Sequence, residues 1–378
     1  MSLDLNLTES EQMLRAAALD FMRRDAPKEV VQKLQDTDTG TTDQLWKTAA
    51  DLGWLGIIIP EEYGGTGNPL TSAGVLFEAL GTGPLPGPFF NSGILGSLII
   101  LEAGSEEQKK ATLPAVAEGK QILTLALTEP EYSWEPRGVQ TTATRKSDGF
   151  VLSGVKLFTM DAGAATQFIV AARTAQGNGA NGISLFLVDS KAKGVSVRRV
   201  PGFLTGRTFE VKLGSVEVPR SALLGEQGQG WEPLQQAFAK AIPVLCAYKV
   251  GGAQTVFEMT LEYSRVRVQF GMPIGRFQRV QDMIIEQVDH VDAARWTTYE
   301  ALWKLDTQRP YTESVHLAKA VTSQAYWDVV TLAHRVFSGI SYSKEHAVSF
   351  HTRASRSLYN YLGEPAYHRQ KLGQLILA

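Results

Sequence analysis

The sequence predicts an α+β fold with an N-terminal helical domain, a middle β-sandwich or barrel domain and a C-terminal four-helix bundle. Apolar residues recur at helical spacing at both ends of the chain, and in the middle this pattern gives way to short β-favouring runs. The chain has 378 residues, 44% of them hydrophobic, which is too long for one simple core. We expect domains over residues 1–121, 122–228 and 229–378.

The first domain is expected to be helical throughout. Residues 8–11, TESE, offer a helix cap and early acidic residues before apolar residues spaced three and four apart. A second helical pattern, Trp46–Leu52, ends in the glycine- and proline-containing segment GWLGIIIPEEYGG. Three more helices are predicted, over Leu70–Leu80, Pro88–Ala103 and Glu106–Ala117.

The middle domain is expected to consist of antiparallel strands. Short runs rich in β-branched and aromatic residues follow one another at intervals of roughly 8 to 12 residues, separated by Gly, Asp and Asn. The runs are LTLALTEP, FVLSGVKLF, QFIVAAR, ISLFLVD, VSVRRV and TFEVKLGSVEVP. This spacing favours a sandwich or barrel over alternating β-α units.

Helical spacing returns after Gly228-Gln229-Gly230 in long segments with short connections, which is typical of a helical bundle. The predicted helices are Leu234–Arg267, Val280–Asp306, Tyr311–Ser338 and Glu345–Leu362.

Composition excludes several classes of protein. The formal net charge of -2 gives no reason to expect nucleic acid or an anionic membrane surface as a partner. The single cysteine, Cys246, and six histidines without paired spacing do not predict a disulfide or a metal site. The N-terminus lacks the apolar segment of a signal peptide, and the longest apolar run, Gly93–Leu101, is shorter than the roughly 20 residues of a membrane span. We expect a cytoplasmic protein.

The most informative segment is RVQFGMPIGRFQRVQ, residues 267–281, where Gly and Pro interrupt a helical pattern before it restarts. It places basic and aromatic residues at a bend between helices, which suits a ligand with phosphates and flat rings. The guanidinium group of Arg267 can bind a pyrophosphate with two parallel hydrogen bonds, and Phe270 can cover a flat ring of the ligand. The segment closely resembles the RxQFGxPIGxFQxVQ pattern of the acyl-CoA dehydrogenase family.

This resemblance spans nearly the whole chain. It implies the same three-domain fold, FAD as cofactor, an acyl-CoA substrate and an electron acceptor similar to electron-transfer flavoprotein. In the family, the Arg and Phe of this segment reach an FAD that is bound mainly by a neighbouring subunit. The resemblance therefore implies at least a dimer, with Arg267, Phe270 and Gln278 as cofactor-binding residues.

Two segments of the middle domain resemble flavin-contacting motifs, although each also fits a plain strand end or hairpin. LTEP at 127–130 resembles the start of TEPxxGSD and nominates Thr128 as a flavin contact, but Tyr132 and Trp134 replace small residues on the path of flavin and acyl-CoA. GVKLFTMDA at 154–162 resembles GxKxWITNA. It places Phe158 beside the flavin and Met160 where a Thr normally donates a hydrogen bond, so polar contact with the flavin is weakened.

A third motif lies in the last domain. RVFSGISYSKEH, residues 335–346, resembles QxxGGxGxxxEH, whose glycines let the backbone approach the FAD phosphates. Gly339 is retained as a cofactor-binding candidate, whereas Arg335, Ser338 and Ser341 replace Gln and two Gly. Arg335 either compensates by its charge or lies on a solvated helix face.

The family's catalytic carboxylate is missing from both of its known positions. Acyl-CoA dehydrogenation requires a carboxylate that removes the α-proton. In the YEGT-like turn the counterpart is Tyr361–Pro365, with Gly363 aligned with the carboxylate and Glu364 one residue away as a weak candidate. The alternative position, a Glu-Arg pair on a bundle helix, reads Ala241-Ile242. The catalytic residue is therefore unknown.

Three hypotheses follow. GPLPGPFFNS, FSGISYSKEH and LGEPAYHRQKL most resemble heteromeric dehydrogenases of actinobacterial steroid side-chain breakdown, in which a base-lacking subunit completes the FAD site of its partner. The first hypothesis is such a subunit in an α2β2 assembly. The second is a non-catalytic scaffold without flavin. The third is a self-sufficient homo-oligomer with Glu364 or Glu129 as a relocated base, or one that runs related flavin chemistry such as nitroalkane oxidation or monooxygenation.

Overall fold

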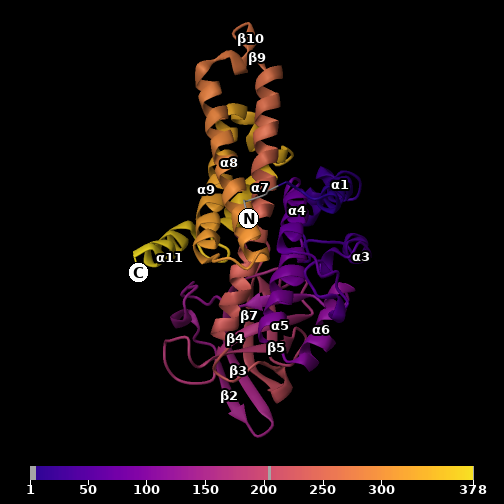
Figure 1. The fold of residues 1–378 in the computed structure, drawn as a ribbon, viewed down its shortest axis with the longest axis vertical. Coiled ribbons are helices and arrows are strands. Elements are labelled where there is room, and N and C mark those ends of the chain that lie inside the picture. The colour runs from indigo at the N-terminus through magenta and orange to yellow at the C-terminus, as the bar shows by residue number, and fades with distance from the viewer. Residues whose placement is uncertain (1–5, 203–205, 378) are drawn as a thin grey trace.

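The computed structural model describes residues 6–202 and 206–377 and confirms the predicted α+β fold (Figure 1). The molecule is elongated. A bundle of long helices forms its upper half, a β-sheet lies at the lower end, and the N-terminal helices pack along one side.

The N-terminal helices are α1 (Glu9–Arg24), α2 (Lys28–Gln35), α3 (Asp43–Asp51), α4 (Leu70–Gly81), α5 (Ser97–Ala103) and α6 (Glu106–Ala117). The predicted start of the first helix is correct, because Thr8 and Glu11 form a capping box. The helix predicted from Pro88 differs from the structure, because residues Phe89–Gly96 (η3) have the wider π winding before α5 begins. Along this segment Gly96 lies so close to Leu123 that a Cβ on the glycine would be 2.7 Å from the leucine Cβ.

The β-sheet has the strand order β6-β7-β3-β2-β4-β5-β8, and β1 pairs with β4. The strands are β1 (Leu123–Ala126), β2 (Thr142–Lys146), β3 (Gly149–Met160), β4 (Gln167–Arg173), β5 (Ile183–Asp189), β6 (Val195–Arg199), β7 (Thr208–Pro219) and β8 (Leu223–Leu224). Most pairs are antiparallel, as predicted, but β4 pairs in parallel with both β1 and β2. The sequence pattern did not predict β2, since four of its five residues are exposed and polar or charged.

The C-terminal helices are α7 (Trp231–Val266), α8 (Gln278–Asp306), α9 (Thr312–Phe337), α10 (Ala347–Tyr359) and α11 (Pro365–Leu377). The first four confirm the predicted helices. The helix α11 was not predicted, because its buried residues are few and do not form an apolar stripe. Its first residue is Pro365, a residue favoured at that position.

Helices α4 and α7 approach each other closely at two glycines. A Cβ on Gly81 would lie 2.0 Å from the carbonyl oxygen of Tyr248, and one on Gly251 would lie 1.8 Å from that of Glu78. Any larger residue at these positions would push the two helices apart. The bundle also caps α4, because the carboxylate of Asp306 accepts hydrogen bonds from the backbone N–H groups of Leu70 and Thr71 at 2.8 and 2.9 Å. The N-terminal helices are thereby fixed to the bundle.

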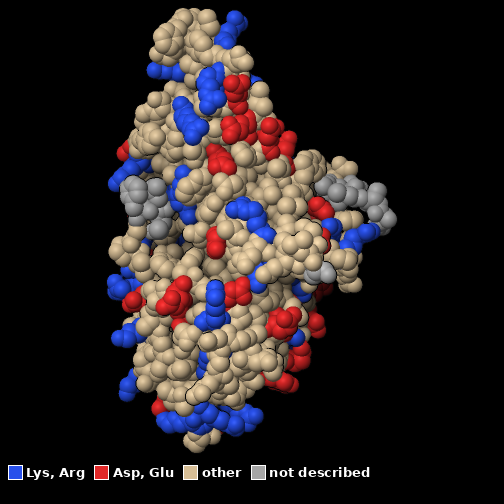
Figure 2. Space-filling model, turned by 90° about the vertical axis from the view of Figure 1, so that its left-hand side faces the viewer, with Lys and Arg blue, Asp and Glu red and all other residues tan. Residues whose placement is uncertain are grey.

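Figure 2 shows acidic and basic side chains mixed over one face of the molecule, with basic ones gathered at its lower end. Within the described ranges, no helix combines the length and apolar character that crossing a bilayer requires.

Candidate functional site

The structure places the predicted cofactor-binding residues in two separate groups. Arg267, Phe270 and Gln278 surround the hairpin of β9 (Val268–Gln269) and β10 (Met272–Pro273) at the upper tip of the bundle (Figure 1). Thr128 and Phe158 belong to the β-sheet region at the opposite end. One chain therefore does not bring the two groups together.

Gly339 belongs with the upper group. It lies in the 3-10 turn η7 (Ser338–Tyr342), directly after α9. The end of α9 packs against the upper part of α7, where the rings of Phe337 and Tyr263 are 4.5 Å apart. A Cβ on Gly339 would meet no atom within 4 Å, so the backbone here is open to a ligand or another chain.

The hairpin exposes the ring of Phe270, and the neighbouring guanidinium of Arg267 is exposed as well. Phe270 is 91% exposed and has a positive φ of 53°, followed by Gly271 with a φ of 80°. Arg267 is exposed and has no ion-pair partner within residues 6–202 and 206–377. Val266, Val268 and Met272 beside it are also exposed, and an apolar patch of this kind indicates a surface that another molecule covers.

A groove of about 570 Å³ lies beside the hairpin. Arg265, Arg276 and Gln281 line it together with Pro273 and Gly275. Guanidinium groups around an open groove fit the phosphates and ribose of a dinucleotide. The tip therefore has the chemistry to hold the phosphate end of FAD.

The β-sheet end offers the flavin ring fewer polar side-chain contacts than the tip offers the phosphates. The hydroxyl of Thr128 donates a hydrogen bond of 2.6 Å to the carbonyl oxygen of Leu157, so its proton is already engaged. Met160 is buried and has no side-chain hydrogen-bond donor. Phe158 is half-exposed at a φ of 57°. Neither the hydroxyl of Thr128 nor the side chain of Met160 therefore offers a free hydrogen-bond donor to a flavin.

Glu129 has a structural role. One oxygen accepts from the Nζ of Lys156 at 2.7 Å and from the backbone N–H of Thr141 at 3.0 Å, and the other accepts from the backbone N–H of Gln140 at 3.0 Å. Burial lowers the pKa of Lys156 to about 8, and the charge of Glu129 opposes that shift. A carboxylate engaged in this way is not free to remove a substrate proton, which argues against Glu129 as a relocated base.

Aromatic side chains fill the space between the sheet and the bundle. We call this cluster the aromatic plug: Tyr132, Trp134, Phe158, Phe238 and Tyr361. Ring centroids are 5.3 Å apart for Tyr132 and Phe158, 6.2 Å for Trp134 and Phe238, and 6.1 Å for Trp134 and Tyr361. Trp134 is only 7% exposed. Of the two bulky residues that the sequence places on the ligand path, Trp134 is buried and Tyr132 is half-buried.

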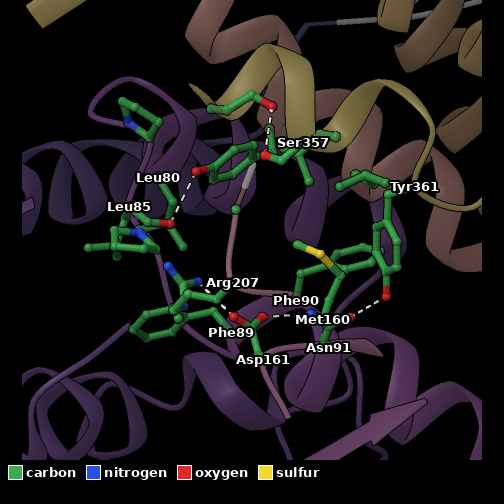
Figure 3. A pocket seen from close by; sticks show the side chains of 18 of the residues that line it. Leu80, Leu85, Phe89, Phe90, Asn91, Met160, Asp161, Arg207, Ser357 and Tyr361 are labelled. Atoms are coloured by element: carbon green, nitrogen blue, oxygen red, sulfur yellow. Dashed lines mark hydrogen bonds and ion pairs between the residues drawn. The ribbon is translucent and has the colours of Figure 1, made fainter. Parts of the chain in front are cut away.

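The plug lies between two cavities. A cavity of about 210 Å³ on one side is lined by Trp134, Ile242 and Leu362. A smaller cavity of about 100 Å³ on the other side is lined by Phe90, Met160 and Tyr361 (Figure 3). Trp134 lines the larger of these two cavities, Tyr361 lines the smaller one, and the two rings are in contact.

A buried polar network borders the smaller cavity (Figure 3). The guanidinium of Arg207 donates to the carboxylate of Asp161 at 2.6 Å, and the side-chain amide of Asn91 donates to the same carboxylate at 2.7 Å. The hydroxyl of Tyr361 donates to the amide oxygen of Asn91. These residues come from η3, the sheet region and the segment after α10, so the network joins all three parts of the fold.

The turn after α10 has two consecutive residues with positive φ and no carboxylate at its centre. Leu362 and Gly363 both have positive φ values, 57° and 97°. Matching Tyr361-Leu362-Gly363 letter by letter to the Tyr-Glu-Gly of the YEGT turn places Leu362, one residue before Gly363, opposite the carboxylate. Leu362 is 2% exposed and faces the larger cavity. Glu364 is half-buried at the start of α11, and its carbonyl oxygen accepts from the backbone N–H of His368.

Two residues that the sequence did not single out hold this turn. The Nζ of Lys319 donates to the carbonyl oxygens of Gly363 and Tyr359 at 2.6 and 3.3 Å, and the Nε2 of His368 donates to that of Leu362 at 2.8 Å. Both side chains are buried, and burial lowers both pKa values, that of His368 to about 2. A lysine in a helical pattern is normally solvated, so the sequence carried no signal for this role.

The alternative position for the base is also apolar. Ala241 and Ile242 are buried inside α7, with exposed fractions of 0% and 4%. Neither of the two positions therefore carries a group that could remove a proton from a substrate.

Comparison with known proteins gives a consistent result. Residues 8–120, 124–211 and 228–377 match the N-terminal, middle and C-terminal domains of acyl-CoA dehydrogenase. A probable acyl-CoA dehydrogenase of Bacillus subtilis is 30% identical, over 98% of each chain. The structure of butyryl-CoA dehydrogenase from Megasphaera elsdenii superposes with a TM-score of 0.93 at 28% identity, over 100% of both chains. The ChsE4-ChsE5 complex from Mycobacterium tuberculosis has the same fold, with a TM-score of 0.89 at 23% identity over 99% of each chain.

Proposed function

The chain belongs to the acyl-CoA dehydrogenase family, and from that premise we propose that it is a base-lacking subunit of an FAD-dependent acyl-CoA dehydrogenase. A paralogous partner subunit supplies the carboxylate base in an α2β2 assembly. The reaction is the α,β-dehydrogenation of an acyl-CoA thioester. The electrons then pass from the flavin to an acceptor similar to electron-transfer flavoprotein.

One observation carries the proposal. The turn Tyr361-Leu362-Gly363 resembles the family's YEGT turn with Leu362 in place of the carboxylate, Ala241-Ile242 stands at the alternative position, and Leu362, Ala241 and Ile242 are all buried. Without a base, the α-proton of a thioester is not removed, and hydride transfer from the β-carbon does not proceed. A chain with this fold therefore needs a partner to complete the reaction.

The residues at the tip of the bundle support the proposal that this chain helps to bind the FAD of its partner. Arg267 binds the pyrophosphate, Phe270 covers a ring, and Gln278 and the open backbone at Gly339 border the phosphates of an FAD whose ring lies in the partner. The bound FAD supplies the hydride acceptor. The aromatic plug closes the equivalent path in this chain, so the acyl group is held by the partner.

We further propose a steroid side-chain acyl-CoA as the substrate. The support is the similarity of GPLPGPFFNS, FSGISYSKEH and LGEPAYHRQKL to the heteromeric steroid dehydrogenases. Steady-state assays of the assembled complex with steroid side-chain and short straight-chain acyl-CoA thioesters test this step, and a higher kcat/KM for the straight chain would contradict it.

The proposal is tested by expressing the chain alone and together with a paralogous acyl-CoA dehydrogenase subunit from a neighbouring gene. We expect dehydrogenase activity with an artificial electron acceptor only from the combination. Full activity of this chain alone would refute the proposal.

A flavin-free scaffold is the second candidate function. The engaged hydroxyl of Thr128 and the loss of a donor at Met160 favour it. Flavin absorbance distinguishes the two candidates, because variants of this chain's tip change the flavin content of the complex only if the tip contacts FAD.

Glu364→Gln addresses the remaining alternative, a relocated base. In a complex with its partner, the variant is expected to keep kcat and kcat/KM within twofold of the wild-type values, because Glu364 lies beside the turn and not at its carboxylate position. Steady-state assay of purified complexes measures this, and Asp306→Asn, which perturbs the cap of α4, is the control for general effects on the fold. A loss of rate of a thousandfold or more in Glu364→Gln would assign the base to this residue.

A further inference from the structure

The imidazole of His334, near the end of α9, connects the turn η7 with α10. Its Nδ1 lies 2.8 Å from the hydroxyl oxygen of Ser341 in η7, and its Nε2 lies 2.8 Å from the hydroxyl oxygen of Thr352 on α10. Ser341 and Thr352 are buried and His334 is half-buried, with the ring of Tyr342 stacked on it at a centroid distance of 5.0 Å. We call His334, Ser341 and Thr352 the His334 clamp.

Both hydroxyls of the His334 clamp already donate to carbonyl oxygens. The Ser341 hydroxyl donates to the carbonyl of Ser338 at 2.8 Å, and the Thr352 hydroxyl donates to that of Val348 at 2.8 Å. Because a hydroxyl carries one proton, each of them can then only accept from the imidazole. All four hydrogen bonds therefore form together only when both ring nitrogens of His334 carry a proton. A neutral imidazole has one N–H, so one hydroxyl must turn away from its carbonyl.

The bond from Ser341 to Ser338 is important because the backbone at Ser338 is strained. Ser338 follows α9 with φ 57° and ψ -143°, a conformation that residues other than glycine rarely adopt. The family motif that this segment resembles has glycines at the positions of Ser338 and Ser341. In this chain the Ser341 hydroxyl holds the Ser338 carbonyl, and His334 orients that hydroxyl. The His334 clamp thus explains two departures from the motif together.

The groups around the His334 clamp disfavour an imidazolium in the isolated chain. Burial lowers the pKa of His334, and the positive charges of Arg356 and His346 lower it further. The clamp also borders a groove of about 830 Å³, whose charged lining residues within the described part of the chain are Asp36, Arg199, Lys344 and Arg353. The carboxylate among them pairs with a guanidinium. A protonated His334 therefore needs a counter-charge from outside the chain.

We propose that His334 is a positioning residue of η7, and that an anion bound at this turn draws a proton onto His334, completes the clamp and fixes the turn. The proton comes from solvent, which reaches the half-buried ring. The anion is a phosphate group of FAD at the open backbone of Gly339, and in this respect the inference rests on the proposed function. An adjacent negative charge raises the pKa of an imidazole. Between the pKa values of the free and bound states, FAD binding takes up one proton, so affinity rises as the pH falls.

The first test measures the affinity of the assembled complex for FAD by flavin fluorescence between about pH 5.5 and about pH 8, the range in which an imidazole titrates. We expect the wild-type dissociation constant to fall by at least about threefold from the upper to the lower pH, with at most about tenfold per unit for one proton. His334→Gln is expected to lose this dependence, because an amide keeps one donor and one acceptor but does not titrate.

The control is His290→Gln, which replaces a half-buried histidine of α8 and is expected to keep the wild-type dependence. A complex with His334→Gln whose affinity for FAD follows the same pH dependence as the wild type would overturn the inference.

The second test uses the chain alone and does not require FAD. The imidazole nitrogens are observed by NMR during a pH titration, and the His334 signal is assigned by its absence from His334→Gln. We expect amide exchange of η7, corrected for its intrinsic rate, to slow as His334 becomes protonated. In Ser341→Ala the ring still titrates but the slowing is lost. Exchange in η7 that does not respond to protonation of His334 would overturn the inference.

The two tests separate this inference from the proposed function. If the assembled complex binds no FAD, the proposed function fails, while the exchange measurements on the chain alone still decide whether protonation of His334 fixes η7.

Discussion

Replacing Arg267 with Gln is expected to lower the affinity of the assembled complex for FAD by roughly 10- to 150-fold, the range for losing hydrogen bonds to a charged group. The guanidinium is exposed at the tip and lacks an internal partner among the described residues, so its removal does not disturb the fold. The dissociation constant is measured by titrating the FAD-depleted complex with FAD and following flavin fluorescence.

The control for Arg267→Gln is Arg24→Gln, which removes an exposed arginine that pairs with Asp20 on α1. This variant is expected to bind FAD like the wild type. Equal affinity of the Arg267 variant and the wild type would show that the tip of this chain does not hold the cofactor, and the scaffold function would then be preferred.

Replacing Glu129 with Gln is expected to destabilise the fold by about 3–5 kcal/mol at neutral pH, because it leaves the ammonium of Lys156 buried without a counter-charge. Lys156 is fully buried and its salt bridge with Glu129 is 2.7 Å long. Urea unfolding of the two proteins measures the difference. The double variant Glu129→Gln with Lys156→Met should recover most of the loss, since no buried charge remains.

This destabilisation should depend on pH with a definite sign. The folded-state pKa of Lys156, already lowered to about 8 from 10.5, falls further when the charge of Glu129 is removed. Between the folded and unfolded pKa values, the folded variant binds fewer protons than the unfolded chain, so its stability rises with pH. The deficit relative to the wild type should shrink as the pH rises to about 8 and stay constant above it, where both folded proteins bind fewer protons than their unfolded chains. A deficit that is also constant below pH 8 would assign the effect to lost hydrogen bonds instead.

The sequence predicted best the elements with clear local signals. The strands QFIVAAR and ISLFLVD have the predicted bounds because each is a short, nearly continuous apolar run, and the helix Glu106–Ala117 begins directly after the capping residue Ser105. The elements that it missed, α2, β2 and α11, are short or mostly polar and are fixed by contacts with distant segments. Propensity carries little information in such cases.

The site was predictable to a lesser degree. The exposed position of Arg267 and Phe270 agrees with a role toward another molecule, and the packing of Trp134 agrees with a closed ligand path. The contacts of Lys319 and His368 with the turn at Leu362 join residues that are far apart in the chain, and such pairings have no local signature. The backbone of the turn was not predictable either, because a positive φ is uncommon for a leucine and the structure has one at Leu362 directly before Gly363.

The central claim is that this chain cannot carry out the reductive half-reaction without a partner. It is tested most directly by mixing acyl-CoA anaerobically with the FAD-supplemented chain, and separately with the assembled complex, while recording the oxidised flavin absorbance. We expect the absorbance of the oxidised flavin to bleach in the complex and to stay constant for the chain alone. Bleaching by the chain alone at a rate similar to that of the complex would contradict it.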